Sequence, residues 1–108
     1  MSHIDDVLKA LCEPTRRRIV EKLTTGPQPV SQLADRLDAS LSTTVQHLAV
    51  LESTGLVHTV KRGRVRICRL DLKALSRVEN WFTQRRLRLE RSFDRLQEYL
   101  ERGEDLDG

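Results

Sequence analysis

The sequence predicts a mainly helical domain that carries one β-hairpin. Apolar residues recur at intervals of three and four between residues 4 and 51, which is the spacing of amphipathic helices. In residues 56–70, β-branched residues flank a basic tip that contains a glycine, a pattern typical of a hairpin. Residues 72–102 return to helical spacing and are numerous enough for one long helix.

Length and composition limit the class of protein. The 108 residues correspond to one domain, residues 1–103, and a domain this small gains stability from a second copy, so we expect a homodimer. No apolar run approaches the roughly 18 residues of a membrane span. The amino-terminal residues lack a secretory pattern, and there are two cysteines. We therefore expect a soluble, cytoplasmic protein with no membrane partner.

The basic residues are concentrated in one segment. The chain has a net charge of +3, but residues 57–95 hold 12 Lys and Arg against 4 Asp and Glu, whereas the other residues hold 7 against 12. Such a segment favours a surface that faces a polyanion such as nucleic acid. The alternative is a charged face that only contacts solvent.

Three short helices are expected before residue 40. Their apolar stripes and end signals place them at about residues 2–11, 14–23 and 31–38. Ser2 and Ser31 are the expected caps of the first and third, and Pro14 suits the first turn of the second.

A fourth helix follows after only two residues. Ser40 is its expected cap and Gly55 its end, and its inward residues are Thr44, Leu48 and Leu51. The opposite face is small and polar, with no charged residue from Ser40 to Leu51. Solvent-facing helices are usually rich in Lys and Glu, so we expect this face to be covered by something other than solvent.

The third and fourth helices have the geometry of a helix-turn-helix, whose second helix enters the major groove of DNA. Gln can bond adenine through two hydrogen bonds, Ser and Thr can bond several bases, and a Val methyl group can contact the thymine methyl group. The polar end of the fourth helix would then contact bases. The alternative is an ordinary core helix with a polar cap.

The predicted hairpin carries four charges of one sign around Gly63, which would repel one another unless phosphates lay nearby. These residues are Lys61, Arg62, Arg64 and Arg66. We predict that they hold the DNA backbone, as the wing of a winged helix does. The alternative is a charged edge that guards against aggregation.

Three segments together resemble the ArsR/SmtB family of bacterial winged-helix repressors over roughly residues 5–82. They are ALCEPTRRRIVEKL, VSQLADRLDASLSTTVQHLAVLESTGLV and GRVRICRL. The resemblance implies a homodimer that binds an inverted repeat in an operator and blocks transcription, usually including that of its own gene. By motif position it implies that Ser42, Thr43, Val45 and Gln46 contact bases, and that Ser40 and His47 support contacts to the DNA backbone.

The sequence departs from the metal sensors of that family. Their cysteine pair lies within or near the helix before the turn, where this chain has SQLADRL, and the carboxy-terminal region here has no histidine. We expect no metal and no cofactor. The inducer stays open between a small molecule, thiol oxidation, a protein and none.

Cys12 and Cys68 are either buried, inert side chains or a thiol-redox switch. The apolar residues around Cys68 occupy both faces of the predicted strand, so its exposure stays open.

The last helix, about residues 72–102, has a heptad-like apolar stripe that a partner helix would cover. Within the family this helix packs with the first helix across the two-fold axis. The predicted dimer interface is Leu8, Leu11, Leu75, Val78, Phe82, Leu89, Phe93 and Leu96. We expect the arginines of this helix to be solvated and ion-paired, and residues 104–108 to form a frayed acidic tail.

The sequence contains no glycine-rich phosphate loop, nucleophile elbow or cluster of metal ligands, so we expect that the protein is not an enzyme. The alternative to a repressor is a protein-interaction or adaptor module that acts through the last helix.

Overall fold

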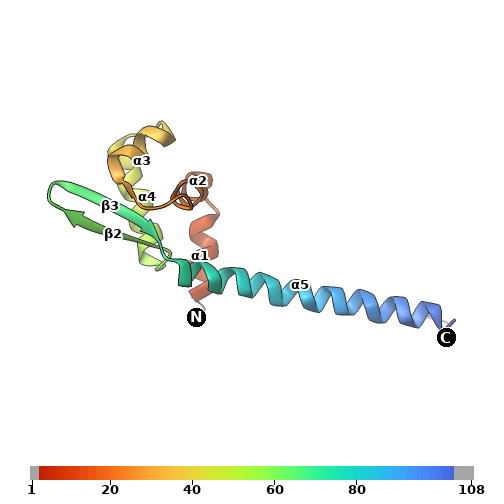
Figure 1. The fold of residues 1–108 in the computed structure, drawn as a ribbon. Coiled ribbons are helices and arrows are strands. Elements are labelled where there is room, and N and C mark those ends of the chain that lie inside the picture. Colours follow the sequence, from red (N-terminus) through yellow and green to blue (C-terminus); the bar gives the residue numbers. More distant parts are fainter. Residues whose placement is uncertain (1–2, 104–108) are drawn as a thin grey trace. The chain divides into compact units, whose positions relative to one another are not determined.

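A computed structural model describes residues 3–103 and divides the chain into two compact units, one ending at Val78 and the other beginning at Glu79 (Figure 1). The expected Ser2 cap and the acidic tail at residues 104–108 lie outside the described residues.

The four short helices predicted in the first unit are observed. They are α1 (His3–Leu11), α2 (Pro14–Leu23), α3 (Val30–Leu37) and α4 (Leu41–Ser53). Glu13 caps α2, because its carboxylate accepts a hydrogen bond of 3.1 Å from the Arg16 N–H. Between α3 and α4, Asp38 adopts a left-handed conformation with φ of 52°, which Asp tolerates better than most residues and which makes the turn tight.

The expected cap of α3 is wrong. This helix begins at Val30, its N-cap is Pro29, and no side chain makes the capping hydrogen bond, so Ser31 lies inside the first turn. The physical reason is that Val30 is buried at 4% exposure and directly follows residues that pair with a strand. These tertiary contacts decide where the helix starts.

The hairpin is part of a three-stranded antiparallel sheet. Strands β2 (Val57–Arg62) and β3 (Val65–Leu70) pair from Val57–Leu70 to Arg62–Val65, so the connection is the two residues Gly63 and Arg64. Gly63 has φ of 64°, as a tight hairpin turn requires. Strand β1 (Gln28–Pro29), which was not predicted from the sequence, pairs with β3, and the strand order is β1-β3-β2.

The core of the first unit joins all four short helices to the sheet. Its fully buried side chains include Val7, Ile19, Leu33, Leu51, Leu56, Val57 and Cys68. Thr44 is also fully buried, and its hydroxyl donates a hydrogen bond of 2.9 Å to the Ser40 carbonyl within α4. This core holds the inner face of α4 and leaves the opposite face exposed.

The long helix α5 (Leu72–Glu101) matches the prediction of a helix over about residues 72–102. Its first turns bury Ala74 and Val78 in the core of the first unit. In the second unit, its large apolar side chains Phe82, Leu89, Phe93, Leu96 and Leu100 are 45–62% exposed. Across the described residues, no helix combines the length and apolar character needed to cross a membrane.

Candidate nucleic-acid interface

The amino terminus of α4 is capped as predicted. The Ser40 hydroxyl accepts a hydrogen bond of 3.0 Å from the Thr43 N–H and donates one of 2.8 Å to the Thr43 hydroxyl oxygen. Both side chains are exposed at the start of the helix. The cap therefore fixes the first turn, and the Thr43 hydroxyl keeps its own proton for an outside acceptor.

The outward face of α4 carries the predicted base-contacting residues. Ser42, Thr43, Val45 and Gln46 are all exposed, whereas Thr44, Leu48 and Leu51 point into the core. Ala49 continues the exposed face one turn after Val45. The structure thus presents an uncharged surface of hydroxyl, amide and methyl groups, the side-chain types that bond or contact base edges in the major groove.

His47 lies on the side of α4 that faces the start of α2. Its Nδ1 atom is 3.4 Å from Nη1 of Arg16 and 3.9 Å from a carboxylate oxygen of Glu13, and its side chain is 20% exposed. Arg16 also donates a hydrogen bond of 2.5 Å from Nε to the Ala10 carbonyl. These contacts tie His47 to the start of α2 and, through Arg16, to α1. No local sequence pattern indicates Glu13 or Arg16 as its partners.

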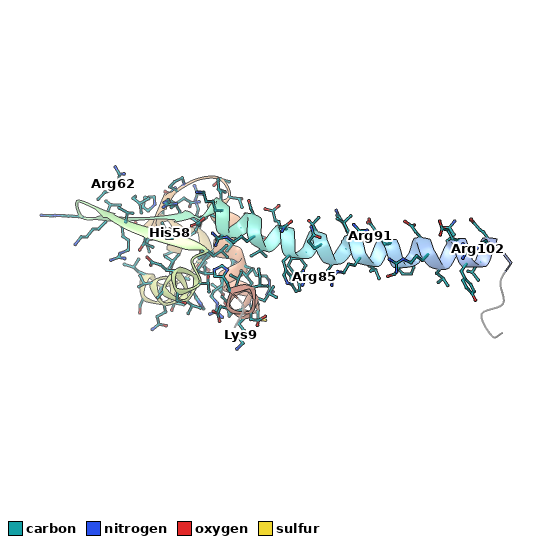
Figure 2. The ribbon with its side chains drawn as sticks, turned by 90° about the horizontal axis from the view of Figure 1, so that it is seen from below. Lys9, His58, Arg62, Arg85, Arg91 and Arg102 are labelled. Atoms are coloured by element: carbon teal, nitrogen blue, oxygen red, sulfur yellow. The ribbon has the colours of Figure 1, made fainter. Side chains whose placement is uncertain are left out.

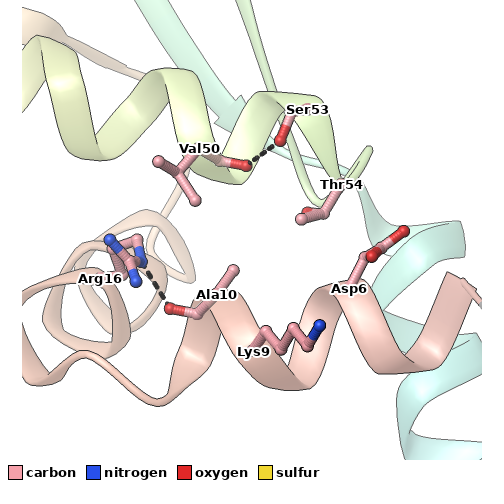
Figure 3. A pocket seen from close by; sticks show the side chains of 7 residues that line it. All are labelled: Asp6, Lys9, Ala10, Arg16, Val50, Ser53 and Thr54. Carbon is pink, nitrogen blue, oxygen red and sulfur yellow. Dashed lines mark hydrogen bonds between the residues drawn. The ribbon is translucent and has the colours of Figure 1, made fainter.

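A shallow hollow lies beside these contacts, between α1, the start of α2 and the end of α4 (Figure 3). Its side chains are Asp6, Lys9, Ala10, Arg16, Val50, Ser53 and Thr54. Figure 3 shows the Arg16 guanidinium group at the end of the hollow where it bonds the Ala10 carbonyl. The hollow therefore combines two cations with one carboxylate, and Arg16 helps to fix α4 from this side.

The hairpin presents its four predicted cations on an exposed surface. Lys61, Arg62, Arg64 and Arg66 are all exposed, and Figure 2 labels Arg62 near the tip. Lys61 pairs directly across the strands with Arg66, and like charges in that position destabilise a sheet. Nearby phosphates would remove this repulsion, which favours a polyanion as the partner.

The hairpin lies next to the outward face of α4. Helix α4 contacts β2, and Val45 and Arg66 together line two hollows between α4 and the hairpin. Thr59 of β2 donates hydrogen bonds to the Glu52 carboxylate of α4, at 3.1 Å from its hydroxyl and 3.4 Å from its N–H. The structure thus brings Val45 of the α4 group beside Arg64 and Arg66 of the hairpin group, and Glu52 and Thr59 are additions to the site.

The two cysteines differ in exposure. Cys12 is exposed, whereas Cys68 is fully buried and its thiol donates a hydrogen bond of 3.2 Å to the Gln28 carbonyl. Burial raises the pKa of the Cys68 thiol to about 11. This favours a structural role for Cys68, because the reactive thiolate is suppressed at neutral pH. A redox role for Cys12 stays a prediction.

The predicted dimer residues fall into two groups. Leu8, Leu11 and Leu75 are partly buried and Val78 is buried within the first unit, whereas Phe82, Leu89, Phe93 and Leu96 are exposed on the second. Within residues 3–103, no group of three or more His, Cys, Asp or Glu side chains is placed to hold a metal ion.

A tight helix pair whose second helix presents an uncharged outer face, followed by a basic hairpin, defines a winged helix-turn-helix DNA-binding protein. Residues 11–60 match the model of a helix-turn-helix domain family. The chain belongs to the ArsR family of transcriptional regulators, as the following relatives show, and it is a regulator rather than an enzyme.

The HTH-type transcriptional regulator Rv2034 of Mycobacterium tuberculosis is 40% identical over 72 residues, which cover 67% of either chain. The transcriptional repressor SdpR of Bacillus subtilis is 26% identical over 78 residues, covering 72% of this chain and 87% of that protein.

Two solved structures are also similar. The ArsR family transcriptional regulator RHA00566 is 34% identical, with a TM-score of 0.75 over 82% of this chain and 98% of that one. The homodimeric winged helix-turn-helix DNA-binding domain Mb0332 of Mycobacterium bovis is 25% identical, with a TM-score of 0.63 over 86% of this chain and 83% of that one.

Proposed function

We propose that this protein is a homodimeric, cytoplasmic repressor that binds an inverted-repeat operator, including one that controls its own gene. The observation that carries the proposal is that the outer face of α4 is uncharged from its capped amino terminus to Ala49, beside a basic hairpin. Solvent alone does not explain about three helical turns without charges, and the edges of DNA bases match the chemistry of this face.

Each group of residues has a distinct role in this proposal. Gln46, with Ser42, Thr43 and Val45, selects the sequence by contacting base edges in the major groove. Ser40 and His47 support contacts to the DNA backbone near α4, and Lys61, Arg62, Arg64 and Arg66 bind phosphates along the hairpin. The phosphate contacts supply affinity for any DNA, while the base contacts discriminate among sequences.

Dimerisation is supported by the exposed apolar side chains of residues 82–100. The homodimeric state of the related Mb0332 domain supports the same assembly. In our proposal, α1 with Leu8 and Leu11 joins α5 in the interface. A two-fold dimer presents two copies of α4 in opposite orientations, so its operator has to be an inverted repeat.

Repression is supported by SdpR, which is a transcriptional repressor. A dimer bound over a promoter would exclude the transcription machinery by occupying the DNA. Release could follow a small molecule or oxidation of the exposed Cys12, and in this proposal neither signal requires a metal or another cofactor.

Fluorescence anisotropy tests the proposal. The full chain is titrated onto DNA from upstream of its own gene and onto scrambled DNA of equal length, across a range of salt concentrations and with or without reductant. Tight, salt-dependent binding to the upstream fragment alone is the expected result. Equal and weak binding to both fragments would contradict autoregulation, and weak binding to every duplex selected from a random library would contradict DNA recognition.

The second candidate is a protein-interaction module, which the same exposed apolar stripe of α5 favours. Neutralising Lys61, Arg62, Arg64 and Arg66 separates the two functions. It should abolish DNA binding by a repressor, but it should spare a protein partner that is held by Phe82, Leu89 and Phe93.

A further inference from the structure

We infer that Glu52 is a positioning residue for DNA binding, because its hydrogen bonds to Thr59 hold the hairpin at one orientation relative to α4. The inference rests on the proposed function, since only a DNA-binding protein needs α4 and the hairpin to meet a single duplex together. Beside a surface that binds DNA, the negative charge of Glu52 would by itself be unfavourable, so its presence calls for a structural role.

Three side chains from three elements form a directed chain of hydrogen bonds. Nη1 of Arg66 in β3 donates to the Thr59 hydroxyl of β2 at 3.0 Å. The Thr59 hydroxyl has one proton, which it donates to the Glu52 carboxylate of α4 at 3.1 Å. Both side-chain hydrogen bonds run in the same direction, from Arg66 through Thr59 to Glu52, so they polarise and strengthen one another.

A backbone contact reinforces the side-chain contacts. Strand β2 is at the edge of the sheet, since the strand order is β1-β3-β2. The Thr59 N–H donates to a Glu52 oxygen at 3.4 Å, so this N–H is directed toward α4 and not toward β3. Glu52 therefore bonds both the backbone and the side chain of one residue, which restricts rotation of the hairpin as well as its distance from α4.

Because Glu52 is charged, the direction in which its removal changes DNA affinity tests the inference. Glu52 is the one Asp, Glu, Lys or Arg residue among residues 41–53, and it lines the hollow that also contains Val45 and Arg66. A carboxylate this close to the proposed DNA surface repels phosphates. Removing it would raise DNA affinity if charge were its only influence, but would lower affinity if it positions the hairpin.

The experiment compares Glu52→Ala with Glu52→Gln, whose amide oxygen can still accept the bond from Thr59. The probe is a duplex that the wild-type chain selects from a random-sequence library. We expect Glu52→Ala to weaken binding about three- to ten-fold, the size of effect that loss of an ordinary, solvent-accessible hydrogen bond produces. We expect Glu52→Gln to bind at least as tightly as wild type.

Thr59 gives a second pair of variants. Thr59→Val removes the hydroxyl at nearly constant volume and should weaken binding as Glu52→Ala does, while Thr59→Ser should restore it. The double variant Glu52→Ala/Thr59→Val should be no weaker than either single variant, because both remove the same contact. Glu21→Ala, which removes an exposed acid from α2, measures the effect of charge alone.

Amide hydrogen exchange reports on the contact without DNA. Exchange of the Thr59 N–H should be faster in Glu52→Ala than in wild type and in Glu52→Gln. Tighter DNA binding by Glu52→Ala, or unchanged exchange at Thr59, would overturn the inference. Loss of binding by the wild type on every duplex would instead refute the proposed function, and the positioning role would fall with it.

Discussion

His58 Nε2 lies 2.6 Å from Oδ2 of Asp71, which joins the first residues of β2 to the start of α5. The other carboxylate oxygen of Asp71 accepts a hydrogen bond of 3.0 Å from the Ala74 N–H, so Asp71 caps α5. The Asp71 N–H donates to the Leu56 carbonyl at 2.8 Å. One residue thus connects the hairpin, the preceding loop and the long helix.

The cap at Asp71 predicts an acid-sensitive contribution to stability. The Ala74 N–H bond, and then the His58 bond, lower the pKa of Asp71 from 3.8 to about 2. Because the folded pKa lies below the unfolded value, the stabilisation is fully present above about pH 4 and is lost as the pH falls toward 2. Thermal melts of the wild type and Asp71→Ala between pH 2 and pH 7 measure this loss.

We expect Asp71→Ala to melt a few degrees below wild type at neutral pH, with the difference shrinking in acid. Asp71→Asn serves as the control, because its amide oxygen can still cap α5 but does not titrate. Equal melting temperatures for wild type and Asp71→Ala at pH 7 would contradict the role of the cap.

Gln46→Ala should impair recognition of the operator selectively. If Gln46 bonds a base edge, its loss costs about 1–3 kcal/mol on the selected sequence and little on scrambled DNA. Anisotropy titrations on both duplexes at one salt concentration measure the difference. Gln84→Ala removes an exposed glutamine of α5, outside the proposed DNA surface, and is the control. Equal losses on both duplexes would mean that Gln46 contributes no base discrimination.

Arg62→Ala should act on every DNA sequence alike. An arginine that neutralises a phosphate contributes counterion release, so its loss should reduce the slope of log affinity against log salt by about 1. Arg91→Ala removes an exposed arginine of α5 and should leave the slope unchanged. A slope that stays at the wild-type value in Arg62→Ala would show that this part of the hairpin does not contact phosphates.

Cys12 and Cys68 should react with iodoacetamide at very different rates. Cys12 is exposed and should be alkylated in the folded protein at neutral pH, whereas Cys68 is fully buried and should react only on unfolding. Mass spectrometry of tryptic peptides over time distinguishes the two sites. Alkylation of Cys68 as fast as Cys12 under native conditions would contradict its burial.

The raised pKa of Cys68 also predicts the direction of an alkaline effect. Burial raises this pKa from 9.0 to about 11, so the unfolded chain loses the thiol proton at lower pH than the folded chain. Stability from this group is therefore full below about pH 9 and declines as the pH rises toward 11. Cys68→Ala should remove that dependence, which denaturant titrations between pH 8 and pH 11 would detect.

The helices and the hairpin could be predicted because their signals are local. In α4, Ser40 precedes an apolar spacing that selects Thr44, Leu48 and Leu51 for the core, and the same spacing determines which residues face outward. The hairpin turn follows from a glycine between two β-branched segments. Such patterns depend on backbone geometry that neighbouring residues share, so the sequence alone is sufficient.

Other features depend on residues that are distant in sequence or on side-chain packing. Strand β1 is two residues long and includes a proline, so it has no alternation to detect, and it forms because β3 offers its edge. The exposure of Cys68 was open because apolar residues lie on both sides of its strand, and in the structure this thiol faces the Gln28 carbonyl of β1.

The sequence by itself therefore determined the order of helices, the outward chemistry of α4 and the charge of the hairpin. Only the tertiary structure decided that His47 faces Arg16, that His58 meets Asp71 and that Glu52 bonds Thr59. The physical reason is that a helix or turn is selected by short-range periodicity, whereas a contact between side chains of different elements depends on how those elements pack.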